Sequence, residues 1–295
     1  MSETHPRSER PGAATVDTPY VRFIILSGPR TGSNLLARSL NSHPEVTCFG
    51  EVFNFMIDFV MYNVEGYDNL NPADLALQRR DPLQLLRQRV FGAHSQRTRA
   101  VGLKFHYDQL WGHQDLQDGL TGDKGLRVLH LQRRNLLRAL ISLKIAEQTG
   151  VWVVPTGRKL TLANVGKAFR HPGWAVQKLS ALLPRMETAK SSAPAGVSIS
   201  PEELYEYIIR MEITRAKFDD MFRDHSTHTV LYEDLQRDRE AVFNQTQAFL
   251  GVEPRPLAAA LQKQNPEPLR ELLENYDELY EAFGDGDHGW MFEDG

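Results

Sequence analysis

The segment FIILSGPRTGSNLLARSL, residues 23–40, limits the possible folds more than any other part of this sequence. It starts in a near-continuous apolar run, residues 21–26, which is typical of a strand buried on both faces. A turn with Gly28 and Gly32 follows, and then a helical pattern. A glycine loop between a buried strand and a helix directs backbone N–H groups and a helix N-terminus at one point in space. We therefore expect an anion to bind at this loop.

The rest of the chain also alternates between short apolar runs and helical patterns. Further strands are expected at residues 45–49, 100–107, 126–132 and 227–235. The patterns at residues 135–148, 201–221 and 241–251 indicate helices. Strands that alternate with helices predict an α/β fold, with a central parallel sheet and helices on both faces.

Length and composition set the broad class of protein. The chain has 295 residues, enough for a sizeable core, and a formal net charge of −4, which argues against a nucleic-acid coat protein. Residues 1–19 are polar and are expected to form a disordered tail, leaving residues 20–295 as a single domain. The single cysteine, Cys48, excludes a disulfide framework. Without an apolar run of membrane-spanning length or a signal-peptide segment, we expect a cytoplasmic protein with no transmembrane segment.

The glycine loop departs from the nucleotide loop of ATP- and GTP-dependent enzymes. That loop needs a lysine after its second glycine and a following hydroxyl for Mg²⁺. Here Gly32 is followed by Ser33 and Asn34, and the cation, Arg30, stands two positions earlier. The loop therefore suits an oxyanion that needs no metal, and a sulfuryl group fits because it carries less charge than a transferring phosphoryl group.

A second anion site is expected where the strand at residues 126–132 ends. Arg134 follows this strand, and Ser142 lies eight residues later, a little over two helical turns along. An arginine at the end of a strand and a hydroxyl on the next helix can together hold one phosphate.

These two motifs resemble those of sulfotransferases that use 3′-phosphoadenosine 5′-phosphosulfate (PAPS). Residues 28–34 are similar to their 5′-phosphosulfate loop, and residues 134–142 to their 3′-phosphate motif. The resemblance to bacterial carbohydrate sulfotransferases, of the trehalose and nodulation-factor kind, continues through residues 142–152, 230–252 and 269–279. It implies a P-loop-like fold, PAPS as the donor co-substrate and a sugar hydroxyl as the acceptor. It also implies a set of donor-binding residues: Arg30, Thr31, Gly32, Ser33, Asn34, Arg134 and Ser142.

Two residues compete for the role of general base. Glu51 matches the proposed base of the trehalose-type enzymes, and nearby Phe49, Phe53 and Phe55 are expected to raise its pKa towards the working pH. His106 lies in a Lys-Phe-His sequence that resembles the Lys-x-His of cytosolic sulfotransferases, where the histidine is the base. Lys104 shares a strand face with His106 and is expected to reach the sulfate or the bridging oxygen. We favour Glu51, and count Glu51, His106, Arg30 and Lys104 as the candidate catalytic residues.

Two other functions remain open at this stage. One is a P-loop-type small-molecule kinase that uses ATP and Mg²⁺, although the missing Gly-Lys-Ser/Thr weighs against it. The other is a non-catalytic nucleotide-binding protein. We expect a small-molecule or glycan acceptor, no metal and no nucleic acid, and the sequence leaves open whether the chain forms a homodimer.

Overall fold

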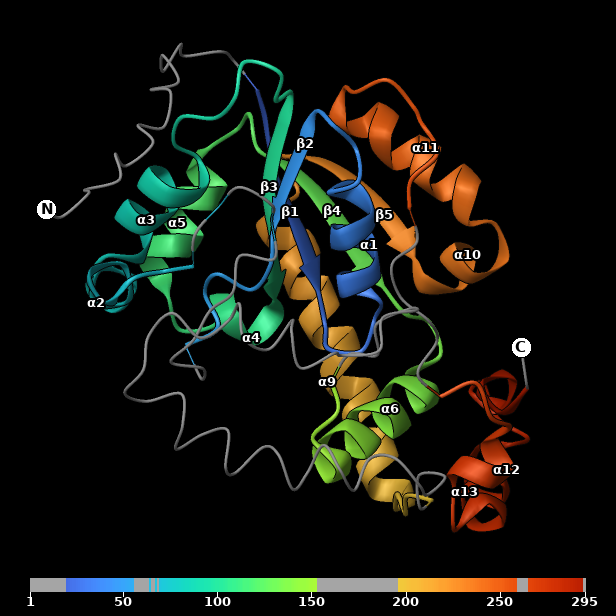
Figure 1. Cartoon of the computed structure of the whole chain (residues 1–295). Helices are drawn as coiled ribbons and strands as arrows, with labels where there is room; N and C mark the ends of the chain where they lie inside the picture. Colours follow the sequence, from blue (N-terminus) through green and yellow to red (C-terminus); the bar gives the residue numbers. More distant parts are fainter. Residues whose placement is uncertain are drawn as a thin grey trace, which may run out of the picture.

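The fold is a three-layer α/β sandwich around one parallel sheet (Figure 1). The computed structural model describes residues 20–55, 64, 67, 69–152, 196–258 and 265–293, so the expected tail at residues 1–19 lies outside the described residues. The five strands are β1 (Val21–Ser27), β2 (Val46–Phe49), β3 (Ala100–His106), β4 (Arg127–Gln132) and β5 (Ser226–Leu231), in the order β2-β3-β1-β4-β5. All four strand pairings are parallel, which confirms the predicted fold class.

The central strand β1 supplies side chains to both faces of the sheet. Phe23 and Ile25 pack on one face with residues of α1 (Ser33–Leu40) and α11 (Arg239–Leu250), and Leu235 of α10 (Tyr232–Arg237) joins them. Ile24 and Leu26 point to the opposite face. Because successive side chains of a strand alternate, a strand buried on both faces has to be apolar throughout, as residues 23–26 are.

The second face carries the larger set of helices. Their buried or partly buried apolar side chains belong to one core that includes Leu103 and Phe105 of β3. The set comprises α2 (Pro72–Arg80), α3 (Pro82–Leu85), a π-helical turn at Leu86–Val90, α4 (Tyr107–Leu110), α5 (Gln114–Gly122), α6 (Leu136–Thr149), α9 (Pro201–Met221), α12 (Leu269–Leu272), α13 (Tyr276–Phe283) and a 3₁₀ turn at Gly289–Phe292. Figure 1 shows α9 running behind the sheet and α6 below it.

The predicted elements differ from the observed ones mainly at their ends. The strand expected at residues 227–235 stops at Leu231, and Tyr232 begins α10. Glu233 and Asp234 lie in the first turn of that helix, where carboxylates are favourable because the N-terminus carries partial positive charge. The helices expected at residues 135–148 and 241–251 are α6 and α11, and each ends at a left-handed glycine, Gly150 or Gly251.

The sheet brings the ends of its strands to one edge. Ser27 at the end of β1 is aligned with His106 at the end of β3 and with Leu131 of β4. The chain leaves β1 towards β2, whereas it leaves β4 towards β5, so the connections diverge at the carboxyl ends of these two neighbouring strands. Ligands of open α/β sheets bind at such a point. No helix in the described part of the chain is long and apolar enough to cross a membrane.

We predict that Gly102→Ala destabilises the sheet. A Cβ atom at this position would lie 2.5 Å from the backbone oxygen of Phe23 and 2.5 Å from its ring, so the two central strands would have to separate. We expect the free energy of unfolding in urea to fall by about 1–3 kcal/mol, as for other overpacked cores. The control is Gly122→Ala, where no atom lies within 4 Å of the added Cβ. Equal unfolding midpoints for the two variants would contradict the prediction.

Candidate active site

The loop between β1 and α1 has the backbone of an anion site. Arg30 has φ of 60° and is the one non-glycine residue with positive φ among the described residues, and Gly32 has φ of 89°. Such left-handed residues turn consecutive N–H groups towards one side. The Thr31 hydroxyl donates to the Gly28 carbonyl at 2.9 Å and closes the loop from within, so it is already used.

The N-terminus of α1 has no side-chain cap. Its N-cap is Gly32, which has no side chain to accept from the first amides of the helix. The amides of Ser33 and Asn34 belong to the first turn, where a helix offers no backbone acceptor. An anion at the loop would satisfy these donors and the positive end of the helix together.

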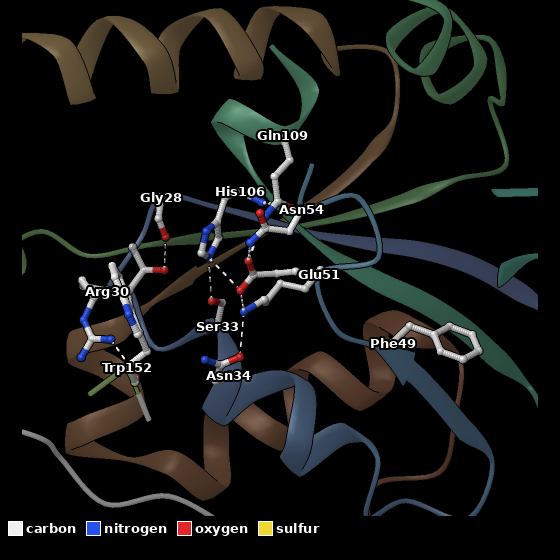
Figure 2. A network of polar contacts seen from close by, with 12 residues as sticks. Gly28, Arg30, Ser33, Asn34, Phe49, Glu51, Asn54, His106, Gln109 and Trp152 are labelled. Carbon is white, nitrogen blue, oxygen red and sulfur yellow. Dashed lines mark hydrogen bonds and ion pairs between the residues drawn. The ribbon is translucent and has the colours of Figure 1, made fainter. Parts of the chain in front are cut away.

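Arg30 connects the loop to α6. Its Nε donates to the Ser142 hydroxyl at 2.9 Å. Its Nη1 donates to the Trp152 carbonyl at 2.8 Å (Figure 2). Ser142 is buried, whereas the Trp152 side chain is exposed. The structure thus brings Ser142, a residue of the expected 3′-phosphate motif, into direct contact with the arginine of the expected 5′-phosphosulfate loop.

Arg134 lies differently from Ser142. Its side chain is exposed, and the guanidinium carbon lies 5.5 Å from the centre of the Trp290 ring. The carboxylate of Glu233 accepts from the backbone amides of Arg134 and Asn135, at 3.1 and 2.9 Å. Glu233 therefore binds the start of α6 through its backbone amides.

A polar cluster lies beside the loop, where β2 and β3 end (Figure 2). Lys104 Nζ lies 2.6 Å from Glu51 Oε1 and donates to Asn34 Oδ1 at 2.7 Å. His106 Nε2 lies 3.9 Å from Glu51 Oε1 and 3.5 Å from the Ser33 hydroxyl. The structure thus groups the three base and cation candidates with Ser33 and Asn34 of the loop.

The expectation that aromatic neighbours raise the pKa of Glu51 is wrong. Burial does act to raise this pKa, but the charge of Lys104, with smaller contributions from His106 and the Asn54 amide, lowers it to about 2. Phe49 and Phe53 are themselves fully buried in the core, and Figure 2 shows Phe49 pointing away from the carboxylate. Glu51 is therefore held as an anion.

Burial lowers the pKa values of the other two residues of the cluster, His106 and Lys104. Burial, and after it the charge of Lys104, lowers the pKa of His106 to about 4, although Glu51 acts in the opposite direction. Burial also lowers the pKa of Lys104, which is 1% exposed, while Glu51 favours its charged form. At neutral pH the cluster therefore holds a neutral imidazole beside an ion pair.

Two amide side chains that the sequence motifs did not reveal, Asn54 and Gln109, hold this cluster in place. Asn54 and Gln109 donate to Glu51 Oε2 at 2.8 and 2.9 Å, so both carboxylate oxygens are bonded. The side-chain oxygen of Gln109 accepts from the His106 amide at 3.1 Å. Gln109 thus fixes both base candidates at once. Its position in the first turn after β3 was the one signal in the sequence that could have pointed to it.

The described residues include no group of three or more His, Cys, Asp or Glu side chains placed to hold a metal ion. Cys48 is buried, and its burial raises the pKa of the thiol to about 12. The polar groups of the site are thus amides, hydroxyls and cations around one carboxylate and one imidazole, a set suited to binding an oxyanion and moving a proton.

We predict that His106 stays neutral down to about pH 5, because its pKa is about 4. The His106 ring resonances in NMR, assigned by their loss in His106→Gln, should not shift between pH 8 and 5.5. In Lys104→Met the pKa should rise, since a nearby positive charge that disfavours imidazolium is removed. Titration of wild-type His106 near its ordinary pKa of 6.5 would refute this description of the cluster.

Known proteins are similar to this chain over most of its length. No protein-family model matches the chain. Nodulation protein H of Rhizobium tropici is 28% identical over 273 residues, which is 92% of each chain. Nodulation protein H of Rhizobium meliloti strain 1021 is 25% identical over 92% of this chain and 94% of its own.

Two solved structures are also similar. A sulfotransferase from Alicyclobacillus acidocaldarius aligns with a TM-score of 0.43 and 17% identity, over 82% of this chain and 86% of its own. The sulfotransferase domain of the Synechococcus PCC 7002 olefin synthase aligns with a TM-score of 0.36 and 15% identity, over 83% and 78%. The likeness to nodulation protein H thus extends over nearly the whole chain and, together with the motifs at residues 28–34 and 134–142, it supports a carbohydrate sulfotransferase.

Proposed function

We propose that this sulfotransferase takes the sulfuryl group of PAPS and transfers it to a hydroxyl of a carbohydrate or glycoconjugate. The observation that carries the proposal is the contact between the loop and the polar cluster. Asn34 of the loop accepts from Lys104, and Lys104 pairs with Glu51. A group bound at the loop would therefore lie next to a cation and a proton acceptor.

The 5′-phosphosulfate would bind at residues 28–34. The uncapped amides of α1 and the Arg30 guanidinium supply donors and positive charge there. The 3′-phosphate would bind between the Ser142 hydroxyl and the Arg134 side chain. The 2.9 Å contact between Arg30 and Ser142 supports this arrangement, because one nucleotide can span two neighbouring sites.

The reaction would break the bond between sulfur and the bridging oxygen and form a bond from sulfur to the acceptor oxygen. The acceptor proton would pass to the Glu51 carboxylate, and adenosine 3′,5′-bisphosphate would leave with the electron pair of the broken bond. Lys104 would stabilise the negative charge that grows on the bridging oxygen. As Lys104 turns towards that charge, its hold on Glu51 weakens and the pKa of Glu51 rises, which makes the carboxylate a better base.

His106 is the alternative base. It is neutral at working pH, so its ring can accept a proton. Its Nε2 lies 3.5 Å from the hydroxyl of Ser33, a loop residue, and 3.9 Å from Glu51. Under the Glu51 proposal His106 orients the acceptor, and the two roles lead to different kinetics.

The donor proposal predicts a nucleotide preference. In calorimetry, adenosine 3′,5′-bisphosphate should bind tightly and EDTA should not weaken it, whereas ATP with Mg²⁺ should bind poorly. The reason is that the loop has Ser33 where metal-dependent nucleotide loops have lysine. Preference for ATP with Mg²⁺ would instead favour the kinase.

The base proposal predicts that Glu51→Gln lowers kcat by about 10²–10⁴-fold, the range for loss of a general base. The KM for PAPS should change little, because Glu51 touches the cation and not the donor loop itself. Initial rates would be measured with labelled PAPS and a panel of carbohydrates. Glu206→Gln, an exposed change on α9, is the control. Near-wild-type kcat in Glu51→Gln, together with an inactive His106→Ala, would transfer the role of base to His106.

A further inference from the structure

Arg133 precedes the arginine of the expected 3′-phosphate motif and lies in quite different surroundings. Its side chain is 7% exposed, whereas that of Arg134 is exposed. Arg133 Nη1 donates to the backbone carbonyl of Arg30 at 3.1 Å. This buried cation thus reaches under the loop that, under the proposed function, binds the 5′-phosphosulfate.

Tyr232 forms the other half of the contact with the loop. Its ring lies 4.5 Å from the guanidinium carbon of Arg133, as in a cation–π pair. A Cβ atom at Gly32 would lie 2.8 Å from the Tyr232 ring, which leaves room for glycine alone. Tyr232 therefore fixes how closely the loop approaches the helix that starts at this residue.

Arg133 and Tyr232 thus contact the two left-handed residues of the loop. Arg30 has φ of 60°, a backbone conformation that residues other than glycine adopt only at an energetic cost. Such a conformation persists only where the surrounding structure holds it. The bond from Arg133 is made to the carbonyl of that same residue. Gly32, with φ of 89°, lies against the Tyr232 ring.

The turn that carries Arg133 is itself anchored. Its backbone carbonyl accepts from Arg215 of α9 at 2.6 Å. Burial lowers the pKa of Arg133, opposed by Tyr232 and Glu233, and its Nε has no hydrogen-bond partner in the structure. The described contacts of this guanidinium are the Arg30 carbonyl and the Tyr232 ring, neither of which carries a formal charge. A buried cation that is so poorly compensated is expensive, and an anion bound at the nearby loop would offset part of that cost.

We propose that Arg133, packed against Tyr232, is a positioning residue for donor binding: it holds Arg30 in the left-handed conformation that directs the loop at the 5′-phosphosulfate. The inference rests on the proposed function. It assigns different ends of the donor to two adjacent arginines, with Arg133 acting on the 5′ end through the loop and Arg134 acting directly on the 3′-phosphate.

The test compares two ligands that differ at the 3′ position. Adenosine 3′,5′-bisphosphate carries a 3′-phosphate and adenosine 5′-monophosphate lacks it while having the same 5′-phosphate, so a residue that acts at the 5′ end affects both equally. We expect Arg133→Met to weaken both by a similar factor of about 10–100, the equivalent of one charged hydrogen bond. The matched control, Arg134→Met, should weaken the bisphosphate alone. Arg133→Lys should recover part of the affinity, since it keeps the charge and one donor.

A purely structural role for Arg133 would change the melting temperature and leave both dissociation constants unaltered, when measured well below that temperature. That result would overturn the inference, as would a loss confined to the bisphosphate. If Arg133→Met does not fold, Tyr232→Leu replaces it, and Tyr232→Phe, which keeps the ring, serves as its control. Failure of the wild-type protein to bind either nucleotide would sink the proposed donor, whereas failure in the variants alone would sink only the role of Arg133.

Discussion

The site depends on a lysine that is almost completely buried. Lys104 is 1% exposed, and a buried ammonium group is tolerated only where it is paired and hydrogen-bonded. Glu51 supplies the charge and Asn34 supplies an acceptor. These partners come from the segment after β2 and from α1, so satisfying one cation fixes the positions of three elements around the end of β3. Removing Glu51 would leave an unpaired charge in the core, and removing Asn34 would take away a hydrogen-bond acceptor of the ammonium group.

Much of the fold follows from sequence because its signals are local. Residues 23–26 are apolar at every position, and the strand they predict is buried on both faces. The glycines at the ends of α6 and α11 stop those helices where expected. The error at Tyr232 also has a local cause, since apolar residues continue past the end of β5 and hide the start of α10. The parallel register then places the ends of β1 and β3 side by side.

The charge states of the site could not be read from sequence, because they depend on distances between segments far apart in the chain. Phe49 and Phe53 lie next to Glu51 in sequence, yet they point into the core, while Lys104, more than fifty positions away, lies 2.6 Å from the carboxylate. For the same reason, the sequence did not reveal that the Arg133 side chain is buried against the loop. Both arginines of the pair follow β4, and only the three-dimensional structure distinguishes the buried side chain under the loop from the exposed one beside Trp290.

The site holds positive charges that repel one another. Arg133 lowers the pKa of Arg30, after the larger effect of burial, and Lys104 in turn disfavours a charged His106. Glu51 neutralises Lys104. The described contacts of Arg30, in the loop, and of Arg133, which binds the Arg30 carbonyl, are carbonyls, a hydroxyl and a ring. A donor that carries several negative charges would supply the missing negative charge where these groups converge. Its binding energy would then come partly from relieving a repulsion already built into the fold, so the preorganised loop and the affinity for an anion have the same physical origin.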